Sequence, residues 1–527
     1  MPGNEAFLRP DVYPFDEEVG AAPFQPTGTS AAGFVDIATW GPIGRATFVS
    51  SLEDFYRQFG SDFTVGHLAR AVKNFFMMGG RRCYIVRTSH YTDITDPDSY
   101  TAQEATVTIS IEGQSGPEEV LRVDAKWPGT RGNKLAVQIA NVDETSKTFD
   151  LYVLDKRDYG YVVLERYRGV TFDENDTTNF VEYRINANPE RRWRGSDYIK
   201  VSYVYLGSDV PVPVADIYHL SGGTNGDVGI TPQDYVGDPA AYNGVYAFDR
   251  VDEIVNICHP GNTSATVIKG GLNYVYNHPY TKPPRTNLYV YDLPLGLTPQ
   301  EALEFVRDDI AFATGYEAVY YPWVKVEDRY DPVAPYVLGH FAKNDFLYGV
   351  WQAPAGVDAL LPVTGLAYEP TLGDQELLYP HGINCITKQD YWGICIWGAR
   401  TLRVHTHFRY LNIRRFVNLI KKTVYNAGKQ FIFEPNAPKT WARIKESAEA
   451  LLMYFYSLGA FAGKTPEESF YVKCDKTTNP PELVNQGICV CEIGICPVRP
   501  LEFLVFNVLV YPEGALPGGE ALSLLSD

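Results

Sequence analysis

The stretch NLYVYDLPLGLTPQEALEFVRDDIAFATGYEAVYYPWVKVED, from Asn287 to Asp328, decides the fold. It begins with a run of β-branched and aromatic residues, which is typical of a strand. A helix start signal follows at Thr298, Pro299 and Glu301. The helix is expected to run to Gly315, because apolar residues recur at helical spacing at Leu303, Val306 and Ile310. YEAVYYPWVKVED predicts the next strand, and this alternation predicts a mixed α/β sheet with flanking helices.

The same alternation of strand and helix patterns continues on both sides of this stretch, with one interruption. Residues 30–90 and the last 150 residues alternate strand and helix patterns, whereas residues 91–215 are rich in alternating Thr, Val and Tyr with frequent turns. This segment predicts an inserted β-rich domain. Near the end, apolar residues from Ile413 to Val424 line one face of a helix, and the neighbouring positions Arg414 and Arg415 are expected to lie away from that face.

The ordered chain is expected to end on a strand, EFLVFNVLVYPEG, from Glu502 to Gly514. Only Asn507 is polar between Phe503 and Tyr511, which is the composition of a strand covered on both faces. FYVKCD and ICVCEIGI predict two strands before it. The sequence shows no partner that would pair with the terminal strand.

Composition excludes several classes of protein. The chain has 527 residues and a net charge of −18, which argues against a nucleic-acid binder and against docking on anionic lipid. No apolar run is long enough to predict a membrane span, and the acidic, proline-rich start predicts no signal peptide. The eight cysteines lie mostly in apolar runs, which predicts buried free thiols in a reducing compartment.

No set of residues has the spacing of a catalytic, cofactor or metal site. SGGTNGDVG is neither a P-loop nor a dinucleotide-binding motif, and no serine lies in a GxSxG elbow. His405 and His407 lack a third ligand, and Cys258 and His259 are expected on opposite faces of a strand. CVCEIGIC, with Cys489 and Cys491 on one strand, lacks a CxxC pair and a nearby histidine, so zinc is not expected.

A series of motifs along the chain resembles the tail sheath proteins of contractile-tailed bacteriophages and related contractile injection systems, whereas residues 91–215 match no sheath pattern. In order, the motifs are TSAAGFVDIATWGPIGRATFVSSLEDFYRQFG, LARAVKNFFMMGGRRCYIVR, GGTNG, YYPWVKVED, HFAKNDFLYGVWQAPAG, GINCI, WGARTL, FRYLNIRRFVNLI, FEPNAPKTWARIK, FYVKCDKTTNPPE and EIGICPVRPLEFLVF. The family often ends soon after EFLVF, whereas this chain continues to Asp527.

The resemblance implies five segments. They are an N-terminal arm (1–25), a sheath core (26–90 with 370–510), an inserted β-rich outer domain (91–215), an α/β middle domain (216–369) and a C-terminal tail (511–527). It also implies a structural subunit, not an enzyme and without a cofactor, that polymerises as stacked hexameric rings around an inner tube. Contraction of this array would drive the tube through a target cell envelope.

The implied partners are other sheath subunits, the inner tube protein, and the baseplate and tail terminator or cap proteins, with no direct contact with nucleic acid or membrane. The implied location is a virion tail or an extracellular or cytoplasmic contractile particle, assembled in the cytoplasm of a bacterial host. The alternative is an α/β hydrolase-like enzyme with a β-sandwich insertion, and a third interpretation makes the insertion an adhesin-like binding module.

Two interaction surfaces follow as expectations. In sheaths, terminal arms add strands to a sheet in neighbouring subunits, so we expect inter-subunit contacts from Val12, Tyr13, Phe503, Val505, Phe506, Val508 and Val510. The alternative is a terminal strand in the subunit's own sheet. The mixed-charge helix from Trp441 to Leu458 is the candidate tube-facing element through Arg443, Lys445, Glu446 and Glu449, or else a core helix with a solvated face.

Overall fold

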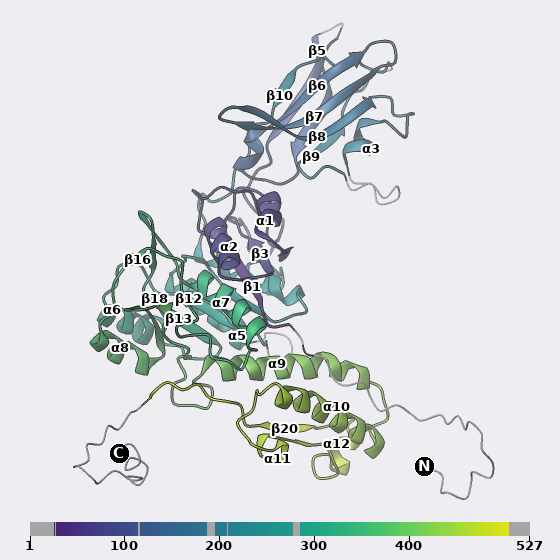
Figure 1. Ribbon diagram of the computed structural model, residues 1–527. Helices are drawn as coiled ribbons and strands as arrows, with labels where there is room; N and C mark the ends of the chain where they lie inside the picture. The colour runs from purple at the N-terminus through teal and green to yellow at the C-terminus, as the bar shows by residue number, and fades with distance from the viewer. Residues whose placement is uncertain are drawn as a thin grey trace, which may run out of the picture.

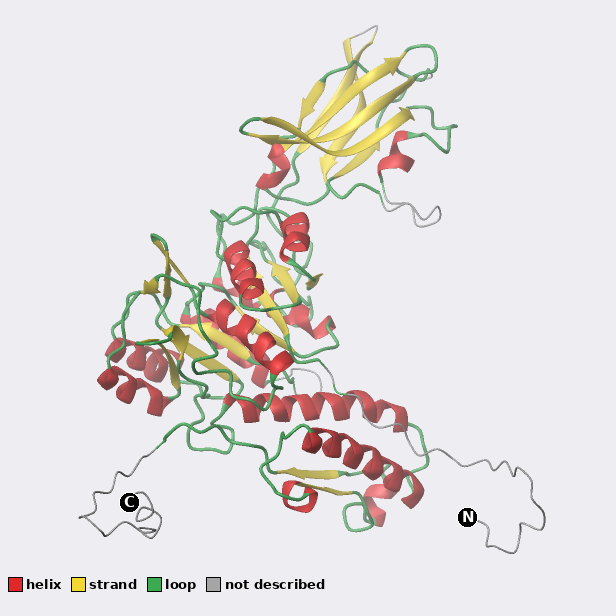
Figure 2. Ribbon diagram, in the orientation of Figure 1, coloured by secondary structure: helices red, strands yellow, loops and turns green. Residues whose placement is uncertain are grey.

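The computed structural model describes residues 26, 28–113, 116–186, 195–207, 209–277 and 285–504. Its three parts follow one another along one direction (Figures 1 and 2): a β-rich module, a unit built on the large sheet, and a helical C-terminal unit. The N-terminal arm (1–25) and the C-terminal tail (511–527) lie outside the described residues.

The central sheet has eight strands in the order β18-β17-β13-β12-β11-β1-β3-β2. Six strands run parallel to their neighbours, and the two edge strands, β2 and β18, are antiparallel. The strands are β1 (Ala31–Asp36), β2 (Thr47–Val49), β3 (Cys83–Arg87), β11 (Val255–Cys258), β12 (Tyr289–Asp292), β13 (Glu317–Tyr321), β17 (Ile383–Gln389) and β18 (Gly393–Ile396). The predicted mixed α/β fold is confirmed.

Helices cover both faces of this sheet. Successive residues of β12 alternate between two cores, because neighbouring side chains on a strand point to opposite faces. Val290 packs with α1 (Leu52–Phe59), α2 (Leu68–Met77) and α7 (Ala334–Leu347). Tyr289 and Tyr291 pack with α5 (Ala265–Tyr276) and α6 (Pro299–Glu304). Burial on both faces explains the near-continuous apolar runs of the strands.

The helix predicted from Thr298 to Gly315 begins as expected. Thr298 caps α6 and forms a capping box with Glu301. The helix ends earlier than predicted: α6 passes at Phe305 into a π-helical turn, η4 (Phe305–Ile310), and Ala311 adopts a left-handed conformation with φ of 51°. Sequence spacing does not distinguish this turn from an α-helix, since both keep Val306 and Ile310 on the buried side.

The β-rich module has a core of its own. Two antiparallel sheets, β4-β5-β9 and β10-β6-β7-β8, enclose buried residues such as Leu121, Val137 and Leu151. The strands are β4 (Thr106–Gly113), β5 (Gly116–Ala125), β6 (Leu135–Asp143), β7 (Thr148–Arg157), β8 (Gly160–Thr171), β9 (Ile199–Tyr203) and β10 (Ile217–His219). The predicted inserted β-rich domain is therefore present. Trp40, from outside the insertion, completes its core.

The C-terminal unit is built on two long helices and a small sheet (Figure 1). Its elements are α9 (Leu411–Gly428), α10 (Pro438–Ser457), α11 (Pro466–Ser469), β19 (Phe470–Lys473), α12 (Pro481–Asn485) and β20 (Glu492–Ile495). The strand predicted from ICVCEIGI begins only at Glu492, so Cys489 and Cys491 lie in the preceding loop. That placement was wrong, because Asn479 instead bonds both backbone groups of Val490.

Smaller elements complete the described structure. They are α3 (Val181–Ile185), α4 (Pro232–Val236), α8 (Leu372–Leu378), β14 (Val324–Val326), β15 (Arg329–Asp331), β16 (Gly365–Leu366) and the 3-10 turns η2 (Thr130–Lys134), η3 (Gly244–Arg250), η5 (Tyr379–His381) and η6 (Lys429–Phe431). The five-segment division of the chain stays a prediction. The large sheet draws strands from 26–90, 216–369 and 370–510 alike.

Candidate assembly surfaces and arm anchors

The predicted arm residues lie mostly beyond what the structure describes. Val12 and Tyr13, as well as Val505, Phe506, Val508 and Val510, are outside the described residues. Phe503 is described, carries no regular secondary structure and is 73% exposed. The structure therefore describes the chain that adjoins the two predicted arms.

A buried ion pair lies directly before the predicted C-terminal arm. Arg400 donates from Nε to Glu502 Oε1 at 3.0 Å, and its Nη2 pairs with Oε2. Tyr379 donates to Oε1 at 2.6 Å, and Tyr410 donates to Oε2 at 3.3 Å. The two charged side chains are only 8% and 11% exposed. Glu502 is thus held by four donors on the residue directly before the predicted arm.

The protonation of Glu502 follows from these partners. Burial on its own raises the pKa of this carboxyl group, but the hydrogen bonds from Arg400 and Tyr379 outweigh burial and hold the pKa below its usual value. The Arg400 guanidinium also stacks over the Tyr379 ring at 4.0 Å. The anchor is therefore a charged pair at neutral pH.

A second buried ion pair lies at the start of the described chain. Thr29 donates to Asp345 Oδ2 at 2.6 Å, and Asn256 donates to the Thr29 carbonyl at 3.1 Å. Arg415, on α9, donates to both oxygens of Asp345, on α7, at 2.8 and 2.6 Å. The ion-paired side chains are 3% and 6% exposed. This network holds Thr29 against α7, which the ion pair links to α9.

The positions of Arg414 and Arg415 correct the sequence interpretation. Both were expected away from the buried stripe of α9, yet both are buried. Arg414 stacks between the rings of Phe408 at 3.6 Å and Tyr316 at 4.1 Å. The reason is that α9 lies between the large-sheet unit and the rest of the C-terminal unit (Figure 1), so opposite sides of the helix are covered. Burial on two sides leaves no fully solvated face for these arginines.

The small sheet of the C-terminal unit has unpaired edges. β19 and β20 pair only with each other among the described residues, in the register Phe470↔Ile495 to Lys473↔Glu492. Val472 packs inward with α10 residues such as Phe455. No third described strand pairs with either outer edge, and Tyr471 of β19 is 52% exposed. Such an edge is a template for another strand.

The predicted tube-facing residues lie along α10. Lys445 and Glu449 form an exposed pair at 3.7 Å one helical turn apart, and Glu446 is exposed beside them. Arg443 behaves differently, because it pairs with Glu434 at 2.8 Å and lies 5.5 Å from the centre of the Phe431 ring. The helix therefore presents a mixed-charge face, with Arg443 already engaged within the chain.

Three thiols gather at one end of the small sheet. Cys474 is buried directly after β19, and its Sγ lies 3.9 Å from the Sγ of Cys489. Cys491 lies close enough to influence the pKa of Cys474. Burial raises the pKa of Cys474 to about 11, and partial burial of the thiol together with the neighbouring Cys474 raises the pKa of Cys489 to about 11, so both are mainly protonated at neutral pH. The expectation of buried cysteines fails for Cys489 and Cys496, which are exposed.

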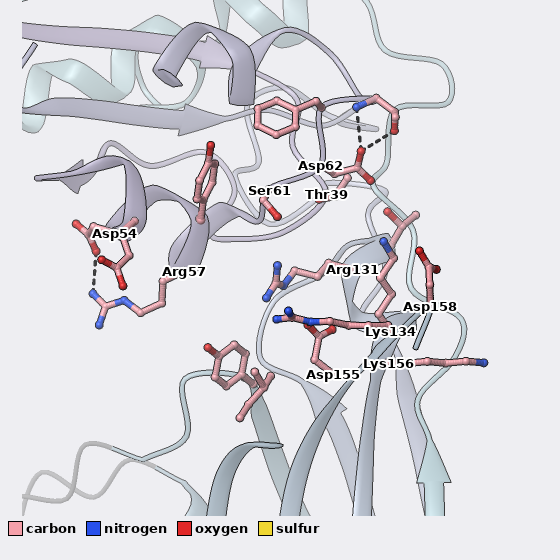
Figure 3. Close-up of a pocket in the computed structure, with 18 of the residues that line it drawn as sticks. Thr39, Asp54, Arg57, Ser61, Asp62, Arg131, Lys134, Asp155, Lys156 and Asp158 are labelled. Atoms are coloured by element: carbon pink, nitrogen blue, oxygen red, sulfur yellow. Dashed lines mark hydrogen bonds and ion pairs between the residues drawn. The ribbon is translucent and has the colours of Figure 1, made fainter. Parts of the chain in front are cut away.

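A polar cleft of about 1510 Å³ separates the β-rich module from α1 (Figure 3). Asp54 and Arg57, from α1, form an ion pair at 2.8 Å. On the module side, Arg157 pairs with Asp155 at 3.2 Å. Lys134 also lines the cleft on the module side. Both walls thus carry charges of both signs, and each of these two ion pairs forms within one wall.

The remaining motifs carry no reactive arrangement among the described residues. Cys258 points into one core of the sheet, while His259 is buried on the other side and shares a 2.8 Å hydrogen bond with the Tyr289 hydroxyl. His405 and His407 are exposed in a turn. No group of three or more His, Cys, Asp or Glu in the described ranges could hold a metal ion. No helix in the described part is long and apolar enough to cross a bilayer.

Two family models match the part of the chain in which the Glu502 ion pair, the small sheet and α10 lie. Residues 300–402 match the model of the phage tail sheath protein central domain, and residues 404–510 match that of the phage tail sheath C-terminal domain. The chain therefore carries segments that match the central and C-terminal domains of phage tail sheath proteins, which are structural proteins.

Individual relatives agree with this assignment. The tail sheath protein of Vibrio phage KVP40 is 28% identical over 211 residues, or 38% of this chain and 31% of that protein. The tail sheath protein of Enterobacteria phage T4 is 27% identical over 200 residues, or 37% and 29%. The matched part thus spans about three tenths of either relative. The contracted helical sheath of the anti-feeding prophage shares the fold, with a TM-score of 0.57 and 19% identity over 95% of this chain and 98% of that chain.

Proposed function

We propose that this chain is the structural subunit of a contractile tail sheath. It polymerises as stacked hexameric rings around an inner tube, and contraction drives the tube through a target cell envelope. The observation that carries the proposal is the C-terminal unit, which belongs to the family by sequence and combines an open two-stranded sheet with a nearby anchored arm. An arm of one copy on the body of another is a heterologous contact, which generates rings or helices.

The arms complete the small sheet of neighbouring subunits. An isolated two-stranded sheet is marginally stable, so β19 and β20 gain most from added strands. Residues 503–510 supply one strand and the segment around Val12 and Tyr13 supplies another. The buried pairs at Glu502 and Asp345 support this proposal, because they fix the place where each arm leaves its own subunit.

In this proposal, contraction requires no bound nucleotide as an energy source. The extended array is kinetically trapped and the contracted array lies lower in free energy, so firing releases energy stored during assembly. The rigid units slide and rotate while the exchanged arms keep neighbours connected. The partners are the inner tube, the baseplate and the tail terminator or cap proteins. The particle is a virion tail or a related contractile injection system, assembled in the bacterial cytoplasm.

Truncation and proline substitution test the arm exchange. Deleting residues 1–20 or 511–527, or introducing Val505→Pro, should convert long tubes seen by electron microscopy into short oligomers or monomers, because proline cannot donate to a ladder. Leu206→Pro, in a fully exposed loop of the β-rich module, is the matched control and should leave tubes intact. Normal long tubes from every arm variant would refute the exchange.

The exposed face of α10 is the proposed contact with the inner tube. A charge-based contact holds before firing and yields during it more readily than an apolar one. Lys445→Glu combined with Glu446→Lys should weaken sheath–tube co-assembly in a pelleting assay, while sheath subunits alone still polymerise. Reversing the surface pair Lys200–Glu104 of the β-rich module, whose atoms are 2.8 Å apart, is the control. Unchanged co-assembly of the α10 variant would reject this assignment.

A further inference from the structure

The three thiols at the end of the small sheet form an arrangement that the proposed function does not use. Cys474 follows β19 directly, and Cys489 and Cys491 precede β20. The strands pair up to Lys473↔Glu492, so Cys474 lies one step beyond the last rung of the ladder. Its Sγ approaches Cys489 Sγ to 3.9 Å. Small side-chain rotations would bring two sulfur atoms at this separation to bonding distance.

The surrounding loop holds these thiols in place. Asn479 is buried, donates to the Val490 carbonyl at 3.1 Å and accepts from the Val490 N–H at 2.6 Å. Its amide also lies 3.9 Å from Cys474 Sγ. Because these hydrogen bonds fix Val490, the backbone of its neighbours Cys489 and Cys491 is held near Cys474. The thiols are not brought together by chance contact of free loops.

The two thiols differ in access. Cys474 is buried, whereas Cys489 is exposed. In thiol–disulfide exchange an accessible thiol reacts first and a nearby protected thiol resolves the mixed disulfide. The pair therefore has the arrangement of an attacking thiol and a resolving thiol, and none of the described His, Cys, Asp and Glu clusters offers a metal-binding alternative.

We propose that Cys474 and Cys489 form a reversible disulfide when the protein meets an oxidised low-molecular-weight disulfide such as glutathione disulfide. The Cys489 thiolate attacks one sulfur of the reagent, a mixed disulfide forms and one glutathione thiolate leaves. The Cys474 thiolate then attacks Cys489 Sγ and expels the second glutathione thiolate. Both cysteine protons pass to the two released thiolates, and the two electrons lost by the protein reduce the reagent.

The bond acts as a clasp on the small sheet. It ties the end of β19 to the segment that enters β20, and it closes a loop that contains α12. Closing this loop reduces the freedom of the open strand pair. This consequence rests on the proposed function, in which β19 and β20 accept neighbouring arms. Cytosolic thiols keep the pair open during assembly, and an oxidising medium outside the cell closes it.

The chemistry is tested on the unassembled full chain, so it does not depend on tube formation. Reduced protein is incubated with glutathione disulfide, and intact mass spectrometry with peptide mapping follows the product. We expect the loss of two hydrogen masses and a Cys474–Cys489 linked peptide. Cys489→Ser and Cys474→Ser should abolish the loss, whereas Cys491→Ser and the exposed control Cys496→Ser should retain it. A linkage through Cys491 or Cys496, or glutathione adducts that never resolve, would overturn the proposal.

The clasp itself is tested by hydrogen exchange. Amides of Phe470–Lys473 and Glu492–Ile495 should exchange several-fold more slowly in the oxidised chain, and addition of a reductant should reverse the change. The Cys489→Ser variant should show no difference between the two conditions. Equal exchange in the oxidised and reduced wild-type chain would overturn the clasp. A failure of the chain to form tubes would instead contradict the proposed function and leave both measurements valid.

Discussion

At the scale of single residues, Asp292 is a buried aspartate with only one of its two carboxylate oxygens hydrogen-bonded among the described residues. Its Oδ1 accepts hydrogen bonds from the Val333 and Ala334 N–H groups at the start of α7, each at 2.9 Å. Its Oδ2 has no partner among the described residues. Burial raises the pKa of Asp292 from 3.8 to about 7, and the two backbone hydrogen bonds only partly oppose this. Near neutral pH the group therefore titrates in the folded protein.

The raised pKa predicts the direction in which the free energy of unfolding changes with pH. The folded chain holds a proton on Asp292 that the unfolded chain releases near pH 3.8, so the free energy of unfolding should fall as pH rises from about 4 to 7. The contribution of this group is up to about 4 kcal/mol. Asp292→Asn should be more stable relative to wild type at pH 8 than at pH 5 in urea unfolding, whereas the exposed control Asp158→Asn should show no such trend. A parallel pH dependence of wild type and Asp292→Asn would contradict this.

Glu502 gives a second test at this scale. Glu502→Gln leaves Arg400 largely buried without its counter-charge, and breaking a buried pair in this way costs about 3 kcal/mol of unfolding free energy. We also expect faster proteolysis of the C-terminal segment. Tyr410→Phe removes only the 3.3 Å hydrogen bond and should cost less than about 1 kcal/mol. Equal stability of Glu502→Gln and wild type would mean that the anchor does not hold the arm.

At the scale of elements, the sequence predicted those strands and helices whose start signals and apolar spacing lie within a few residues of one another. The strand, helix and strand around Thr298 were predictable because the cap and the apolar spacing lie within a few residues of each other. The burial of Arg415 was not, since sequence spacing shows one apolar stripe and cannot show a second covering layer. The ion pair of Arg400 with Glu502 was also not predictable, because the two residues are 102 positions apart and the separate motifs that contain them, WGARTL and EIGICPVRPLEFLVF, do not show that they meet. The predicted arm and tube residues remain proposals.

The ion pair between α9 and α7 can be measured directly. Arg415→Met should lower the free energy of unfolding by about 3–5 kcal/mol, because Asp345 is left charged and buried. Adding Asp345→Asn to this variant should recover part of the loss. Lys445→Ala, which breaks an exposed pair on α10, is the contrast and should cost about 0.5 kcal/mol or less. Similar losses from both single variants would show that the buried pair does not link the two helices.

At the scale of the whole molecule, the β-rich module joins the body through few connections. Gln103 and Thr224 form an antiparallel bridge where the chain enters and leaves the module. Trp40 reaches from the body into the core of the module, and Arg87 donates to the Pro128 carbonyl at 2.6 Å. The polar cleft lies beside these contacts (Figure 3). None of the strands of the large sheet comes from the module, so the two units have separate cores.

Separate cores predict that the module can be removed without loss of the sheath body. Residues 104–223 are replaced by Asn-Gly, which suits a two-residue turn between the bridged residues Gln103 and Thr224. Trp40→Ser accompanies the deletion because this indole loses its covering layer. We expect a soluble chain with cooperative unfolding that still forms tubes, thinner than wild-type tubes in cryo-electron micrographs if the module lies on the outside. The same deletion with Val505→Pro should form none, because in the proposed arm exchange the arms and not the module connect the subunits. A folded deletion variant that stays monomeric would instead place an essential contact between subunits within the module.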